Sequence, residues 1–327
     1  MRPTPKLAPR GLPDARALRV RFSHASVGLA DEAHSSQRMS RAAPSRTIPS
    51  GPTTLADGAA GPSVNWPEFV LPVLRRSAVL MNPLLQDSAI DVELASSVVG
   101  LDPGLAFGTL QLANPACGDP GTPIWQLPLA VVAAGREALQ QLVDGAPRIE
   151  PPSSSHEYAQ LTQLASNAVV RACVAHLMAS NLGHCHPKKS FLGGLLFDLP
   201  ELANLTLHYG DSCKVKLLST MCRSLPAALV KATMGDPGDE NSAADPVVAT
   251  IFLADALLRE KTLHPLTPSL EKLAAAPQWS CWPDFDVEQR SSLLQCCSEL
   301  AEWANTRALQ LDPWEFMSRL ECHGPWK

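Results

Sequence analysis

One short run, His184-Cys185-His186, combines three residues of the types that bind metal ions. Imidazole and thiolate groups bind zinc, but adjacent residues rarely satisfy its tetrahedral geometry by themselves, so at least one further ligand is needed. His208 or Cys213 would be of the right type, although nothing in the sequence places either one nearby. The simpler interpretation is an exposed polar turn, which leaves His184 and His186 as alternative metal ligands only.

A second run, His156-Glu157-Tyr158-Ala159-Gln160, differs by one residue from the HExxH motif of zinc metalloproteases. Gln160 stands where the second imidazole would complete the metal-binding helix face, so we reject a zinc site there. His176 lies in a largely apolar run and is interpreted as a packed core residue. The sequence has no GxSxG, P-loop or GxGxxG motif, so it lacks these signatures of nucleophilic catalysis and phosphate binding.

The nine cysteines predict a reduced protein. Their number is odd, they are spread along the chain, and no CxxC pair occurs, which is typical of buried thiols rather than a disulfide framework. Cys296 and Cys297 are adjacent on an expected helix, where neighbours point about 100° apart, so we expect no disulfide between them. Cysteine usage of this kind favours a cytoplasmic location.

Charge and hydropathy exclude two classes of partner. Residues 63–327 contain 18 Lys and Arg against 28 Asp and Glu, a net charge of −10, which would repel a phosphate backbone. Aromatic residues make up only 5% of the chain, too few for a base-stacking surface. No stretch approaches the roughly 18 apolar residues of a membrane span. We therefore expect neither a nucleic acid nor a membrane partner.

Residues 1–62 form a separate region by composition. They contain 9 Lys and Arg, 4 Asp and Glu, and 8 of the 30 prolines, with no apolar period of 2 or 3.6 residues. Such a segment buries too little apolar surface to offset its ordering entropy, so we predict a disordered tail. No continuous apolar segment of a secretory signal follows Arg2 and Lys6. A transit peptide, which the early prolines disfavour, and a true start downstream at Met39 remain open.

The rest of the chain is helical in pattern. Apolar residues recur every three or four positions over 157–182, which predicts a long helix ending at Gly183. Aspartate followed by proline is typical of a helix start, because Asp caps free N–H groups and Pro loses no hydrogen bond at the first position. The pairs Asp102-Pro103, Asp245-Pro246 and Asp312-Pro313 therefore predict helices over 104–114, 247–259 and 314–320. Further helices are expected over 67–80, 91–99, 128–143, 189–205, 227–233 and 287–309.

These elements predict an all-α body of many helices. The Pro- and Ser-rich stretch 145–155 and the polar stretch 235–244 interrupt the helical pattern. We divide the chain into the tail, a helical domain over 63–260 with subdomains 63–145 and 156–260, and a C-terminal helical extension over 261–327. Five of the seven tryptophans follow residue 278, and we interpret them as packing residues of this extension rather than as a docking surface.

Seven segments in collinear order resemble the HDOD domain family, whose members are divergent relatives of the HD-type metal phosphohydrolases. The matching segments are 71–74, 98–105, 110–116, 124–135, 191–200, 225–237 and 251–259. They include the family's Asp102-Pro103 pair, Asn114 and the Gly194 of a Gly-Gly-Leu-Leu segment. The resemblance implies a helical bundle in which Asp102, Pro103, Asn114, Gly194 and Phe197 hold structural positions.

The chain departs from the catalytic HD pattern at its histidines. Ala165, Phe197 and Met234 stand where the metal-binding imidazoles would be expected, and only Asp198 and Asp255 remain. Two carboxylates without imidazole hold a hard cation only if further oxygen atoms join them. We therefore expect Asp198 and Asp255 to be paired or capping inside the bundle, with Phe197 filling the former metal volume.

The resemblance implies a non-catalytic, HDOD-type signalling or regulatory protein that acts through an unidentified protein partner, without a cofactor, as in bacterial signal transduction. The alternative is a residual metal-dependent HD-type phosphohydrolase that uses Asp198 and Asp255. A further hypothesis is a small-ligand sensor with a cavity between the two halves of the domain.

Overall fold

The computed structural model describes residues 70–87, 90–114, 123–149, 156–183, 186–207, 211–235, 245–263 and 269–307. All of them belong to one compact unit, Ala60–Lys327. Helices dominate the described residues, which confirms the all-α prediction. The expected tail and the helix expected over 314–320 lie outside these ranges. None of the helices within them is both long and apolar enough to cross a membrane.

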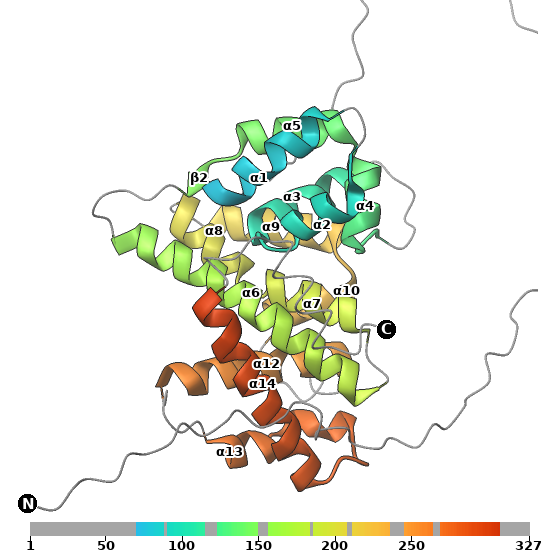
Figure 1. Ribbon diagram of the computed structural model, residues 1–327, viewed down its shortest axis with the longest axis vertical. Coiled ribbons are helices and arrows are strands. Elements are labelled where there is room, and N and C mark those ends of the chain that lie inside the picture. The colour runs from blue at the N-terminus through green and yellow to red at the C-terminus, as the bar shows by residue number, and fades with distance from the viewer. Residues whose placement is uncertain are drawn as a thin grey trace, which may run out of the picture. The chain divides into compact units, whose positions relative to one another are not determined.

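The first five helices form an N-terminal group around α3, coloured blue to green in Figure 1. They are α1 (Arg75–Gln86), α2 (Val92–Val99), α3 (Pro103–Ala113), α4 (Leu127–Ala134) and α5 (Arg136–Gly145). Helix α3 packs against α4 and α5, and its Leu105, Phe107 and Leu110 are completely buried. Strands β1 (Val73–Leu74) and β2 (Arg148–Ile149) pair in parallel and join the two ends of this group.

A second group surrounds the long helix α6 (His156–Leu182). It contains α7 (Pro187–Leu196), α8 (Leu199–Leu207), α9 (Asp211–Ser224), α10 (Ala227–Met234) and α12 (Pro246–Leu263). Helix α6 packs against α7, α12 and the C-terminal α14 (Val287–Arg307), as Figure 1 shows. Small residues on α6, such as Ala172 and Ala175, are fully buried and allow these neighbours to approach.

The C-terminal extension consists of α13 (Leu270–Ala274), the 3₁₀ helix η1 (Pro277–Cys281) and α14. Trp279 is buried, and its Nε1 donates a hydrogen bond to the carbonyl oxygen of Leu273 at 2.8 Å. Its ring lies edge-on to the buried Trp282, with 6.0 Å between centroids. These contacts confirm the packing interpretation for these two tryptophans, whereas Trp314 and Trp326 lie outside the described residues.

Several helix boundaries differ from the prediction. The helix expected over 128–143 is divided into α4 and α5, because Gly135 adopts a φ of 77°. The helix expected over 189–205 is divided into α7 and α8 by a turn at Phe197 and Asp198. Helix α1 begins at Arg75 rather than 67, because the backbone before it pairs as β1. Helix α9 was not predicted from the sequence.

Candidate functional site

The most unusual side chain in the helical core is Arg171, near the middle of α6. Only 5% of this side chain is exposed. Arginine is rarely buried unless it has a partner of opposite charge. Its Nη1 donates to Oδ2 of Asp198 at 2.8 Å, and its Nε donates to Oδ1 of Asp255 at 3.0 Å. Its Nη2 also lies 3.0 Å from Oδ1 of Asp255. One guanidinium group therefore bridges the two aspartates that the sequence singled out.

The close contact of α6 with α7 allows this geometry. A Cβ added to Gly194 would lie 2.8 Å from Cα of Ala172 and 3.0 Å from the carbonyl carbon of Arg171, closer than real Cβ atoms approach. Glycine at this position therefore brings α7 against the backbone of α6 beside Arg171. Asp198 lies in the turn between α7 and α8, and its carbonyl oxygen accepts a hydrogen bond from the Leu202 N–H in the first turn of α8. The turn is thereby held next to the arginine.

Phe197 covers the guanidinium of Arg171. The guanidinium carbon lies 4.6 Å from the centre of the Phe197 ring, a cation–π distance. The edge of this ring meets Phe252 of α12 with 5.9 Å between centroids. Phe197 is half-buried and lies against the cluster, whereas the group between the two carboxylates is Arg171. A phenyl ring cannot neutralise two carboxylates, whereas the guanidinium of Arg171 forms ion pairs with both.

Asp255 has a second partner on its own helix. Arg259, one turn further along α12, places Nε 2.7 Å from Oδ2 of Asp255, and 69% of its side chain is exposed. Burial raises the pKa of Asp255, Arg171 and Arg259 lower it, and the carboxylate of Asp198 raises it, with a net shift upward. Two guanidinium groups and two carboxylates cancel in formal charge. The cluster is thus a buried ion-pair network that opens to the surface at Arg259.

This network limits what the two carboxylates can do chemically. A divalent cation at Asp198 and Asp255 would have to displace Arg171 and would gain no imidazole ligand from the positions of Ala165 or Phe197. Within the described ranges, no group of three or more His, Cys, Asp and Glu side chains could hold a metal ion. His184 lies outside these ranges, and His186 is exposed at the start of α7.

Asp102 and Pro103 form the start of α3. Oδ1 of Asp102 accepts a hydrogen bond from the Leu105 N–H at 2.9 Å, and Oδ2 accepts one from the Leu74 N–H at 2.7 Å. Pro103 occupies the first helical turn, as the sequence predicted. Burial raises the pKa of Asp102 to about 6, because it outweighs the hydrogen bonds that favour the charged form. This carboxyl group joins β1 to α3.

Asn114 closes the other end of α3. Its Nδ2 donates to the carbonyl oxygens of Leu110 at 3.0 Å and Ile124 at 2.8 Å, and its Oδ1 accepts from the Ile124 N–H at 2.8 Å. The same Nδ2 lies 3.4 Å from the carbonyl oxygen of Ser224 at the end of α9. One amide therefore links α3, the segment before α4 and the second helical group.

A family model matches the part of the chain that contains these features. The HDOD domain model matches residues 71–232, a range that contains Asp102, Asn114, Arg171 and Asp198. The chain contains an HDOD domain. Its bridging arginine shows that the residues present do not fit the metal centre of an HD-type hydrolase, because both remaining acidic residues are already ion-paired.

One similar solved structure is the MmoQ response regulator from Methylococcus capsulatus strain Bath. Its sequence is 19% identical to that of the present chain, with a TM-score of 0.49. The match covers 69% of the present chain and 98% of the MmoQ chain. A comparison with curated proteins found no match.

Sequence reasoning missed the central residue of this site. Arg171 is the only Asp, Glu, Lys or Arg residue between Leu161 and Leu182. A lone charge in a helix that is apolar on most sides must be buried with a partner of opposite charge. The isolated charge of Arg171 could therefore have been matched from the sequence with the carboxylates of Asp198 and Asp255.

Proposed function

We propose that this HDOD protein is a non-catalytic signalling or regulatory protein of the cytoplasm that acts by binding another protein. The observation that carries the proposal is the ion pairing of Arg171 with both Asp198 and Asp255. A guanidinium supplies the positive charge that a metal ion would supply in a hydrolase, but it provides no activated water and no open coordination position. The acidic pair is therefore assigned to structure rather than to catalysis.

Membership of the HDOD family supports the signalling part of the proposal. The resemblance to HD-type hydrolases implies that Phe197 and Met234 stand where catalytic members hold imidazoles. A domain that keeps the helical bundle but lacks those imidazole ligands still has a rigid surface to which another protein can bind. Such binding requires no cofactor.

Metal binding and hydrolysis assays on the full-length chain test the non-catalytic part. The chain is incubated with Mg²⁺, Mn²⁺ or Fe²⁺, its bound metal is measured, and phosphodiesters and nucleotides are offered as substrates. We expect no stoichiometric metal and no turnover above the protein-free rate. Turnover that is lost in Asp198→Asn and retained in Asp284→Asn, a control at an exposed acidic residue, would establish the phosphohydrolase instead.

Cross-linking in the cells that produce the chain tests the interaction part. The full-length protein is cross-linked, purified under denaturing conditions and examined by mass spectrometry. We expect one partner protein to be recovered reproducibly and in amounts comparable with the chain itself. Recovery of the chain alone, at native expression level, would contradict an interaction function.

A further inference from the structure

Helix α4 presents an apolar face to solvent. Its sequence, Leu127–Ala134, contains no charged residue, and Leu129 and Val132 are 54% and 61% exposed. Ala133 is also exposed, whereas Ala130 and Val131 on the opposite side are buried. Leu129, Val132 and Ala133 have the i, i+3, i+4 spacing that places side chains on one face of a helix. Grouped exposed apolar residues of this kind mark interaction surfaces.

The direction of α4 follows from two contacts with its neighbour α2. Leu127, at the beginning of α4, has Cδ1 3.6 Å from the position of a Cβ on Gly100, directly after α2. Arg136, just beyond the end of α4, donates from Nη1 to the carbonyl oxygen of Asp87, before α2, at 3.2 Å. The two helices pack together and run antiparallel. The beginning of α2 therefore lies beside the end of α4.

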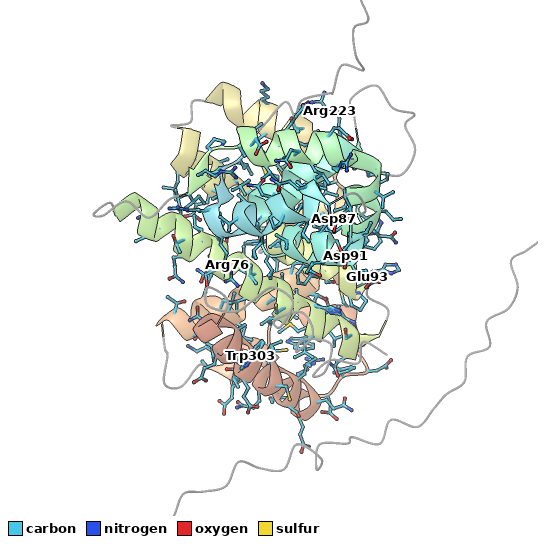
Figure 2. The ribbon with its side chains drawn as sticks, turned by 45° about the horizontal axis from the view of Figure 1, so that its top comes forward. Arg76, Asp87, Asp91, Glu93, Arg223 and Trp303 are labelled. Atoms are coloured by element: carbon cyan, nitrogen blue, oxygen red, sulfur yellow. The ribbon has the colours of Figure 1, made fainter. Side chains whose placement is uncertain are left out.

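Acidic side chains gather at that end. Asp87, Asp91 and Glu93 are exposed, and Figure 2 shows the three close together on one side of the molecule. Oδ1 of Asp91 accepts a hydrogen bond from the Leu94 N–H at 3.0 Å, which holds its charge at the helix start. Arg136 lies among them and forms an ion pair with its neighbour Glu137. An apolar helix face thus ends at a group of net negative charge.

We propose that this surface binds a cationic amphipathic helix of a partner protein. The α4 face is defined by Leu129, Val132 and Ala133 together with Asp87, Asp91 and Glu93. Apolar residues of the partner helix would pack on the first three, and its Lys or Arg residues would meet the last three. The inference rests on the proposed interaction function and deepens it by naming the surface and the charge of the partner.

Charge favours such a partner over a second copy of the chain. Residues 63–327 carry 18 basic and 28 acidic residues, so two copies repel one another at long range. A cationic helix is attracted by the same field and oriented by the acidic group at one end of α4. The occupant that fits the α4 face is therefore basic.

Two synthetic peptides test the proposal on the full-length chain. Both are amphipathic helices with Leu on one face; one carries Lys on the other face and the matched peptide carries Glu. Binding is followed by fluorescence anisotropy of a dye on the peptide. We expect the Lys peptide to bind with an affinity that falls as salt is added, and the Glu peptide not to bind. Equal binding of both peptides, or binding of neither, would overturn the proposal.

Matched variants locate the binding site. Val132→Glu should weaken binding of the Lys peptide by about tenfold or more, as expected for a central contact residue. Val287→Glu, at a 64% exposed valine on α14, should leave it unchanged. Glu93→Gln should weaken binding about two- to threefold and reduce its salt dependence, as for an exposed charge pair. Glu288→Gln is its control, because both glutamates lie in the first turn of a helix.

The remaining outcomes separate the α4 assignment from the interaction function. Equal losses in the test and control variants would mean non-specific attraction to an acidic protein, which overturns the assignment. If light scattering shows a dimer that Val132→Glu converts to a monomer, the occupant is a second copy of the chain, which also overturns the assignment. A cellular partner that still cross-links to Val132→Glu would show that the docking surface lies elsewhere on the protein. The proposed interaction function would then stand.

Discussion

Arg171 and Asp198 meet at 2.8 Å between Nη1 and Oδ2, although they are separated by 27 residues and come from different elements. Their side chains are 5% and 15% exposed, so the pair lies in a region with little water to screen it. The same guanidinium binds Asp255, which makes this arginine the link between α6, the α7–α8 turn and α12. Stability should therefore depend on it strongly.

Arg171→Ala should destabilise the fold by about 3–5 kcal/mol, because it leaves two buried carboxylates without their counter-charge. Urea unfolding at neutral pH measures the loss. Arg259→Ala is the control, since that arginine also contacts Asp255 but is 69% exposed, and it should cost about 1 kcal/mol or less. Equal losses of unfolding free energy in the two variants would mean that the buried bridge stabilises the fold no more than the exposed ion pair does.

Removing the charges together should restore much of that loss. The triple variant Arg171→Met, Asp198→Asn, Asp255→Asn leaves no uncompensated buried charge, because Arg259 is 69% exposed, and we expect it to be more stable than Arg171→Ala. Urea unfolding of both variants measures the difference in their unfolding free energies. A triple variant that is less stable than Arg171→Ala would contradict the account of the site as an ion-pair network.

Asp102 should make the protein less stable as pH rises from about 4 to about 7. Burial raises its pKa from 3.8 to about 6, so between these values the folded state binds more protons than the unfolded chain. Its stabilising contribution is complete below the lower value and is lost as pH rises through the upper one, a loss of about 3 kcal/mol. Unfolding free energies measured across this range check the direction.

The comparison with Asp102→Asn isolates this contribution. Asparagine keeps one acceptor for the hydrogen bonds from Leu105 and Leu74 but does not titrate. The variant should be less stable than the wild type at acidic pH and should show a smaller decline toward neutral pH. Identical pH profiles for the two proteins would show that Asp102 is not the group responsible.

Gly194→Ala should destabilise the protein by about 1–3 kcal/mol, because the new methyl group meets backbone atoms of Ala172 that cannot move alone. Thermal or urea unfolding measures the change. Gly108→Ala provides the contrast, since the three atoms nearest to its methyl group all belong to the Leu142 side chain rather than to backbone. We expect Gly108→Ala to cost less, and the reverse order would contradict the close contact of α6 with α7.

Thiol labelling of the native protein should separate the cysteines by burial. Cys222 is exposed and should react with iodoacetamide before the half-buried Cys281 and Cys296. Cys173 and Cys297 are buried, and burial raises the pKa of both thiols, so they should react only after unfolding. Mass spectrometry of the digested protein identifies each modified site. Rapid native labelling of Cys173 would mean that the packing around α6 is incomplete.

Local signals in the sequence predicted the starts of α3 and α12. Asp102 caps α3 with Pro103 in the first turn, and Oδ1 of Asp245 accepts from the N–H groups of Val247 and Val248 at the start of α12. These hydrogen bonds span two or three residues, so the residue types alone determine them. The division of the expected 128–143 helix was less visible, because it depends on the conformation that one glycine adopts.

Sequence by itself thus determined the helical class, the HDOD resemblance and the identity of the two surviving aspartates. Tertiary structure alone decided what pairs with them: Arg171 lies 27 and 84 residues away from Asp198 and Asp255. Contacts at such separations depend on how α6, α7 and α12 pack, here on the absence of a side chain at Gly194. Local hydrogen bonds are set by neighbouring residues, whereas a buried ion pair requires the whole bundle to be assembled.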